Sequence, residues 1–380
     1  MRYGFTTGSC AAVAAKAAAY MLLTGLKKTE FAIETPKGIR YNAKLLDIMY
    51  GENEASCAVE KDGGDDLDIT TGIWIYAKVS YINTKDINTK ENRKKEQEII
   101  IEGGMGVGRV TKPGLDQPVG NAAINRVPRE MIKKEVLEIC RLTDYKGSLR
   151  VEISVPEGKK LCEQTFNSRL GIVDGISILG TSGVVEPMSS QALIDTIRVE
   201  LRQRKALGYD YVAVSPGNYG LDFMRKRYGY NLDKSVKCSN FIGATIDMAV
   251  EMGFQKMLLT GHIGKLIKVA GGIMNTHSKE ADCRLELLAA FSIREQVEPL
   301  QIQNILDCVT TEEAIPFLEK SGKLQRVMEQ IAERICYYME NRAGGKMKTD
   351  CILFSNQYGE LAKSKEAEEW FILLGQEQGQ

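Results

Sequence analysis

From Leu149 onward, short runs of β-branched and aromatic residues alternate with longer segments that have helical periodicity. The expected strands are residues 151–155, 176–179, 211–215 and 256–260, and the expected helices are residues 190–206 and 241–252. Such alternation is typical of a parallel sheet with crossover helices, whose ligands bind beyond the carboxyl ends of the strands. We therefore predict a Rossmann-like α/β domain over residues 149–380, in which a mainly parallel sheet is flanked by helices and a helical region follows.

The first 148 residues have a different pattern, in which one alanine-rich helix precedes several strands. Thr7 or Ser9 is placed to cap this helix, which is expected to end near Gly25. The expected strands are residues 31–35, 41–48, 55–60, 73–82 and 98–101, and an amphipathic helix over residues 126–142 follows them. The polar stretch 83–97 is expected to be an exposed loop. This order predicts an N-terminal α+β domain over residues 1–148.

Charge and cysteine content exclude several classes of function. Fifty Lys and Arg residues balance fifty Asp and Glu residues, so no global field would attract nucleic acid or an anionic membrane. No run approaches the roughly 20 apolar residues that a membrane span needs. The nine cysteines are scattered and never spaced as CxxC, which is typical of reduced thiols. We expect a cytoplasmic protein that binds neither nucleic acid nor membrane.

Both histidines of the chain lie in residues 260–279, a segment that follows an apolar strand and opens a helix. Its glycines would let backbone N–H groups approach an anion, and Lys265 and Lys268 would add positive charge. His262 and His277 are candidate catalytic residues, because imidazole exchanges protons near neutral pH. The alternative is that both are structural. Neither has the cysteine or carboxylate spacing of a known zinc site, so we predict no protein-bound metal.

Other glycine-bearing loops have the composition of ligand loops. Residues 171–183 place an apolar strand before a loop of small residues, and residues 216–220 follow another expected strand. Residues 103–108 have glycines at dinucleotide-like spacing, but Pro113 and Gly114 interrupt the chain where a helix would begin. None of these loops has the GxGxxG fingerprint between a strand and a helix, and none has the lysine of a P-loop. Loops at the strand ends are expected to share one ligand crevice, although each alone is also compatible with an ordinary turn.

Eight longer strings occur in a fixed order along the chain. They are GFTTGSC from Gly4, KDGGDD from Lys61, GMGVGRVTKPGL from Gly104, AAINRVP from Ala122, DGISILGTSGVVEPMS from Asp174, GNYG from Gly217, KCSNFIG from Lys237 and GHIGKLIKVAGGIMNTHSK from Gly261. Together they resemble the cobalt-precorrin-5B C1-methyltransferase family over about residues 3–285. Asn121 departs from the pattern, which has an acidic residue at that place.

The resemblance implies an activity in anaerobic cobalamin biosynthesis. The enzyme would transfer a methyl group from S-adenosylmethionine to C-1 of cobalt-precorrin-5B, giving cobalt-precorrin-6A and S-adenosylhomocysteine. The cobalt would belong to the tetrapyrrole substrate. Neighbouring corrin-pathway enzymes are expected partners, because such intermediates are unstable. Two alternatives stay open: a non-catalytic tetrapyrrole carrier, and an enzyme of nucleotide or phosphate chemistry.

Site residues follow from the chemistry of these two substrates. The acetate and propionate arms of the tetrapyrrole require cations, for which the candidates are Arg109, Lys112, Arg126, Lys237 and Lys265. The family lacks the usual donor-binding signature, so the donor is placed at glycine-rich strand ends. The candidates there are Gly175, Gly180, Thr181, Gly183, Gly217, Asn218 and Gly220. If a ring proton leaves, His262 or His277 would accept it.

Overall fold

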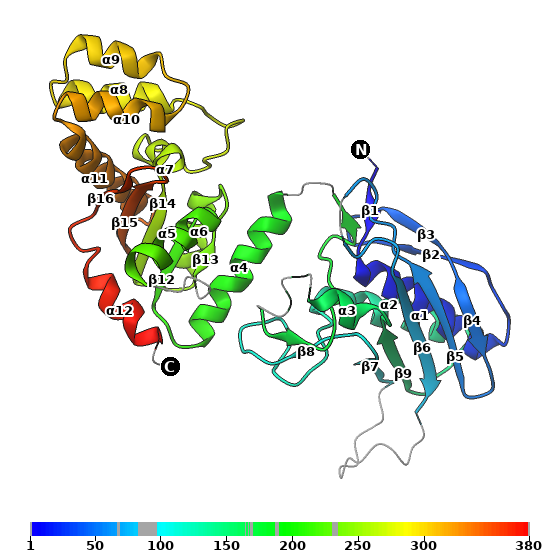
Figure 1. The fold of residues 1–380 in the computed structure, drawn as a ribbon. Helices are drawn as coiled ribbons and strands as arrows, with labels where there is room; N and C mark the ends of the chain where they lie inside the picture. The colour runs from blue at the N-terminus through cyan, green and yellow to red at the C-terminus, as the bar shows by residue number, and fades with distance from the viewer. Residues whose placement is uncertain are drawn as a thin grey trace. The chain divides into compact units, whose positions relative to one another are not determined.

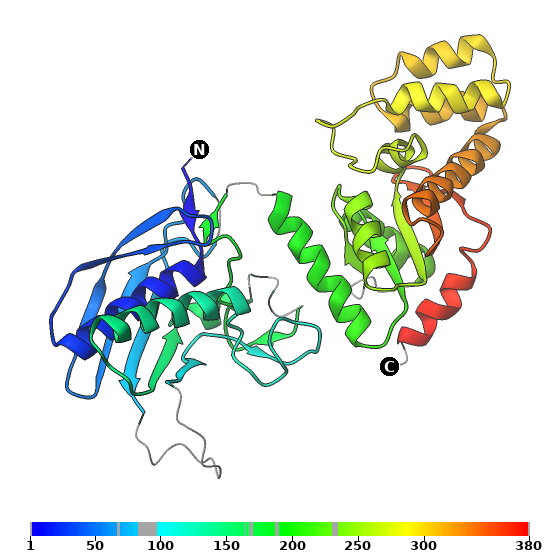
Figure 2. The ribbon, with the colours of Figure 1, turned by 180° about the vertical axis from the view of Figure 1, so that it is seen from behind.

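The computed structural model describes residues 2–66, 69–82, 97–163, 165, 167, 170–186, 190–229 and 235–378. It divides into two compact units, Met1–Ser189 and Ser190–Gln380, each with its own core (Figures 1 and 2). The expected loop at residues 83–97 falls almost entirely outside the described residues. Among the described residues, no helix is long and apolar enough to cross a membrane.

The first unit is built on a five-stranded mixed sheet. Its order is β4-β5-β6-β9-β7, in which only the β7–β9 pair is parallel. The helices α1 (Thr7–Thr24) and α2 (Arg126–Leu142) lie side by side over one face of this sheet (Figure 2). The strands are β4 (Leu46–Tyr50), β5 (Glu54–Glu60), β6 (Trp74–Tyr81), β7 (Ile99–Gly103) and β9 (Leu149–Ser154). The predicted α+β character of this part is confirmed.

Helix α1 is the buried centre of the first unit. Fifteen of its 18 residues are buried, because its alanines allow the sheet and α2 to approach closely. The cap is Thr6, which accepts a hydrogen bond from the Ser9 N–H, and not Thr7 or Ser9 as expected. The Thr7 and Ser9 hydroxyls donate instead to the carbonyls of Leu179 and Gly183. Long-range partners therefore displaced both residues from the capping role.

Residues 149–186 belong to the first unit, whereas we expected them in the second. Strand β9 alternates buried Leu149, Val151 and Ile153 into the first core and pairs with β6 and β7. The expected strand at 176–179 forms only isolated bridges, of Ile176 with Val107 and of Ile178 with Ile124. The strand periodicity predicts β9 correctly, but periodicity does not indicate which sheet a strand joins.

Smaller elements complete the first unit. The short pairs are β1 (Gly4–Phe5) with β11 (Val184–Val185), β8 (Arg109–Val110) with β10 (Ile172–Val173), and β2 (Glu30–Glu34) with β3 (Arg40–Lys44), beside α3 (Gly158–Cys162). The β1–β11 pair joins the beginning of the unit to its end. The same segment that begins α1 is therefore held by residues almost 180 positions further along the chain.

The second unit contains the predicted sheet with flanking helices. The sheet order is β13-β12-β14-β15-β16, and every pair is parallel except β15–β16. The strands are β12 (Tyr211–Ser215), β13 (Val236–Lys237), β14 (Lys256–His262), β15 (Lys348–Ser355) and β16 (Gly359–Lys363). Three further helices, α8 (Arg284–Arg294), α9 (Pro299–Leu306) and α10 (Thr311–Lys320), pack as a group (Figure 1). The mainly parallel α/β architecture is confirmed.

Helices cover both faces of this sheet. One face packs against α5 (Asn218–Tyr228) and α12 (Glu369–Gln378) through a cluster around Met224 and Trp370. The other packs against α4 (Ser190–Ala206), α6 (Ile242–Glu251), α7 (Ile263–Ala270) and α11 (Leu324–Arg342). Alternate residues of β14 serve the two cores, Leu258 on one side and Leu259 on the other. This is the doubly wound arrangement.

Candidate functional site at the strand ends of the second unit

The sheet order of the second unit places a topological switch point between β12 and β14. Strand β12 has β13 on one side and β14 on the other. The helix that follows β12, α5, covers one face, whereas the helix that follows β14, α7, covers the opposite face. The two loops therefore leave the carboxyl ends of neighbouring strands in opposite directions, which is where doubly wound sheets bind ligands. Residues 216–217 connect β12 to α5, and His262 is the last residue of β14, directly before α7.

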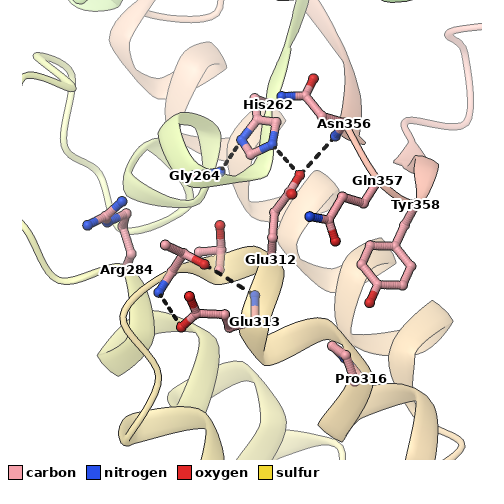
Figure 3. Close-up of a pocket in the computed structure, with 11 residues that line it drawn as sticks. His262, Gly264, Arg284, Glu312, Glu313, Pro316, Asn356, Gln357 and Tyr358 are labelled. Atoms are coloured by element: carbon pink, nitrogen blue, oxygen red, sulfur yellow. Dashed lines mark hydrogen bonds and ion pairs between the residues drawn. The ribbon is translucent and has the colours of Figure 1, made fainter.

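His262 stands at the end of β14 and caps α7. Its Nδ1 accepts a hydrogen bond from the Gly264 N–H at 3.1 Å, so Nε2 carries the proton in the neutral ring and donates to Glu312 Oε1 at 2.8 Å (Figure 3). The ring meets Phe354 of β15 edge-on, and Phe354 stacks on Phe223 of α5. Both ring nitrogens are engaged, so this histidine is rigidly held.

Glu312 is a site residue that the sequence analysis missed. Its Oε1 accepts from three donors, the His262 ring, the Ser355 hydroxyl at 2.7 Å and the Asn356 N–H at 2.9 Å. Burial would raise the pKa of this carboxyl, but hydrogen bonds from Ser355, His262 and Asn356 outweigh burial and lower it. The TTEE string at Thr310 signals only a capping box, in which Glu313 closes the helix start. Nothing local marks Glu312 as the partner of a histidine 50 residues away.

An open pocket of about 580 Å³ lies over this pair (Figure 3). Its lining comes from the end of β14, the start of α10 and the β15–β16 turn, with Arg284 at its edge. The lining residues are His262, Gly264, Arg284, Thr310, Thr311, Glu312, Glu313, Pro316, Asn356, Gln357 and Tyr358. The volume is within the range of small-molecule sites. Among the described residues, no group of His, Cys, Asp and Glu is arranged as a metal site.

The lowered pKa of Glu312 makes the stability of this site depend on pH. Because the pKa of Glu312 is lowered in the folded state, its stabilising contribution is present above the ordinary glutamate pKa and is lost as the pH falls through the folded value. We expect Glu312→Gln to cost about 2 kcal/mol at pH 7. Guanidinium unfolding at pH 7 and pH 3 should show this difference shrinking in acid. Glu319→Gln, at an exposed position on the same helix, is the control, and an equal cost at both pH values would contradict the assignment.

His277 has a different environment from His262. It lies exposed in the connection from α7 to α8, and its Nδ1 accepts a hydrogen bond from the Lys279 N–H at 3.1 Å. No described residue bonds its Nε2. The preceding residue, Thr276, is buried, and its N–H donates to the carbonyl of Asn240 in the turn between β13 and α6. Of the two histidines, His277 is the one with a ring nitrogen open to a ligand.

Two candidate substrate-binding lysines lie at the strand ends of the second unit. Lys265 is half-buried on α7, and its Nζ donates to Asn240 Oδ1 at 3.0 Å. Burial lowers its pKa. Lys237 ends β13, and its backbone N–H donates to the Glu200 carboxylate. Arg109, Lys112 and Arg126 belong to the first unit, where their side chains are exposed. The five predicted cations are thus divided between the two units.

The candidate donor loops are divided in the same way. Gly217, Asn218 and Gly220 follow the carboxyl end of β12 in the second unit, whereas Gly175, Gly180, Thr181 and Gly183 belong to the first. Gly175 has a packing role, since a Cβ there would come within 2.3 Å of the Gly106 carbonyl oxygen. At Gly180 a Cβ would meet Thr6, the cap of α1, at 2.2 Å. These two glycines are required by close packing, whether or not a ligand binds nearby.

A doubly wound sheet with a polar pocket at its strand ends defines the second unit as a small-molecule-binding α/β unit of the kind found in enzymes. The family model CbiD matches residues 1–187, and the model of the CbiD C-terminal domain matches residues 275–365. The chain belongs to the CbiD family, and it is a methyltransferase of cobalamin biosynthesis.

Several relatives carry the same name, cobalt-precorrin-5B C(1)-methyltransferase. That of Ruminiclostridium cellulolyticum is 47% identical over 95% of this chain and 91% of its own length. That of Thermoanaerobacter sp. is 44% identical over 97% of both chains, and that of Methanocaldococcus jannaschii is 41% identical over 96% of both. A crystal structure of cobalamin biosynthesis protein cbiD from Archaeoglobus fulgidus is 25% identical, covers 73% of this chain and 83% of its own, and has a TM-score of 0.38.

Proposed function

We propose that this protein transfers a methyl group from S-adenosylmethionine to C-1 of cobalt-precorrin-5B, giving cobalt-precorrin-6A and S-adenosylhomocysteine. The observation that carries the proposal is the identity of 41–47% to cobalt-precorrin-5B C(1)-methyltransferases over almost the whole chain. A methyltransferase needs a methyl donor. We place the donor at the carboxyl ends of β12 and β14, the switch point of the second sheet. The tetrapyrrole, which brings its own cobalt, is the second substrate, and the cytoplasm is the expected location.

Methyl transfer from a sulfonium donor requires the protein to align the substrates, and it requires no covalent nucleophile on the protein. A ring carbon that is electron-rich through conjugation forms the new bond to methyl as the bond from methyl to the sulfonium sulfur breaks. The residues must hold carbon, methyl and sulfur nearly in line and exclude water. Arg109, Lys112, Arg126, Lys237 and Lys265 would grip the carboxylate arms. His262 and His277 are the candidates to accept a leaving ring proton, and His262 would first have to give up the hydrogen bond that its Nδ1 accepts.

The test of the reaction is an anaerobic incubation of the purified protein with cobalt-precorrin-5B and methyl-labelled S-adenosylmethionine. Mass spectrometry and NMR of the tetrapyrrole would locate the label. Label at C-1 supports donor, substrate and position together. Label at another carbon would retain the enzyme class and refute the position. Tight tetrapyrrole binding without transfer would favour a carrier.

The donor site is tested by enlarging one loop residue in each unit. A Cβ at Gly217 meets nothing within 4 Å, and Thr181 is exposed, so both positions accept a larger side chain without disturbing the fold. We expect Gly217→Leu to weaken S-adenosylhomocysteine binding at least about tenfold, as measured by calorimetry, because the leucine side chain would occupy the proposed donor position after β12. Thr181→Leu reports in the same way on the loop of the first unit. Full affinity in both variants would remove the donor from both loops.

A further inference from the structure

Lys268 of α7 is buried and Lys265 of the same helix is half-buried, and neither has a counter-charge among the described residues. Lys268 is 3% exposed, and its Nζ donates to one neutral acceptor, the Thr276 carbonyl at 3.2 Å. Lys265, three positions earlier on the same helix, bonds the amide oxygen of Asn240 and no other described side chain. No carboxylate of the described residues forms an ion pair with either lysine. Lysine is almost never fully buried unless it is paired.

The local charges make this arrangement costly in the absence of a ligand. Removing an ammonium group from water costs several kcal/mol that one carbonyl does not restore. The pKa of Lys265 is lowered first by burial and further by the charge of Lys268, with Cys238 opposing both. The charge of Lys268 contributes to lowering the pKa of Asp282, but the two carboxylate oxygens of Asp282 are bound to Arg284. The two lysines therefore lack an anionic partner in the part of the chain that the structure describes.

The surroundings of the two lysines are held in place by two joined loops. Phe241 pairs with Asn275 in an isolated bridge, and the Thr276 N–H donates to the Asn240 carbonyl at 3.0 Å. The Thr276 hydroxyl also donates to Asn240 Oδ1, the atom that accepts from Lys265. The polar groups are thus fixed relative to α7. Asn240 and Lys265 are partly exposed, so the cluster is reachable from the surface.

We propose that Lys268 and Lys265, framed by Asn240 and Thr276, form a carboxylate-binding site at the strand ends of the second unit. The inference rests on the proposed function, which supplies two carboxylates: an acetate or propionate arm of the tetrapyrrole, and the α-carboxylate of the methyl donor. Either anion would complete the missing ion pair. Lys268 is a binding residue in this assignment, and its burial excludes water from the bond that it makes.

The experiment replaces Lys268 by methionine, which has a similar length and no charge. S-adenosylhomocysteine and 5′-methylthioadenosine, which lacks the α-carboxylate, are titrated by calorimetry. Cobalt-precorrin-5B is titrated anaerobically by absorbance, a measurement that needs no turnover. Lys265→Met is the second variant, because its half-buried position tolerates the change. Lys348→Met, at a side chain 68% exposed in the same unit, is the control.

The two sources give different results. If the donor carboxylate occupies the site, Lys268→Met weakens S-adenosylhomocysteine binding at least about tenfold and leaves 5′-methylthioadenosine unchanged. If a tetrapyrrole arm occupies it, both nucleosides bind as before and cobalt-precorrin-5B binds at least about tenfold more weakly. In either case the ligand-free variant melts at the same or a higher temperature, since an unpaired buried charge has been removed.

Two outcomes would overturn the site. One is unchanged affinity for all three ligands in both lysine variants. The other is a lower melting temperature of ligand-free Lys268→Met together with unchanged affinities, which would make Lys268 a structural donor to Thr276. Failure of methyl transfer by the unaltered protein would refute the proposed function instead, and the binding titrations would still decide the carboxylate site.

Discussion

Lys16→Met is expected to destabilise the first unit by about 3–5 kcal/mol, because it leaves a buried carboxylate without its cation. Lys16 lies in the middle of α1, and its Nζ is 2.6 Å from Glu135 Oε2 and 3.1 Å from Glu138 Oε2 on α2. The Glu135 side chain is only 4% exposed, so little water reaches it to replace the lost partner. The ion pair fixes the register of the two helices that cover the sheet.

Hydrogen–deuterium exchange isolates this effect from the second unit. Protection of α1 and α2 peptides should fall by roughly two to four orders of magnitude, whereas peptides of α11 should not change. Lys134→Met is the matched control, since Lys134 lies 3.9 Å from the same carboxylate but is 66% exposed, and it should cost less than about 1 kcal/mol. Lys16→Met combined with Glu135→Leu should regain most of the loss. Equal costs for Lys16→Met and Lys134→Met would refute a buried pair.

His277→Gln is expected to lower kcat by about 10²-fold with KM nearly unchanged, on the proposal that this residue accepts the ring proton. The side chain is exposed and its Nε2 is free of described partners, so the variant should fold as the parent does. His262→Gln should instead weaken the cap of α7 and the contact with Glu312, costing about 1 kcal/mol of stability.

Chemical rescue separates the base from a positioning role. Imidazole added to the assay supplies a free base, so it should restore part of the rate of His277→Gln if this residue accepts the ring proton. Glu280→Gln, three positions further along the same exposed segment, is the control. A full rate in His277→Gln would exclude this histidine, and a reduced rate that imidazole does not raise would indicate positioning alone.

Local patterns were sufficient for much of the fold. Helical periodicity predicted α2 at its observed bounds, and alternation of strands and helices predicted the parallel sheet of the second unit. Strands near residues 211–215 and 256–260 are present as β12 and β14. These features depend on neighbours within one or two turns of the chain, which is the range that a sequence pattern reports. Motifs spread over both units also identified the family.

Tertiary structure decided which distant segments meet. Strand β9 belongs to the first sheet because its apolar face completes that core. Glu312 bonds His262, which lies 50 residues earlier in the chain, and the Thr7 hydroxyl donates to the Leu179 carbonyl. The burial of Lys16 and Lys268 likewise appears only when helices pack. The sequence by itself determined the charge and the hydrophobic periodicity of each segment, and these indicate its secondary structure and its possible chemistry. Long-range packing decided which partner each polar group has and how much water reaches it. These two factors set the free energy that the group contributes.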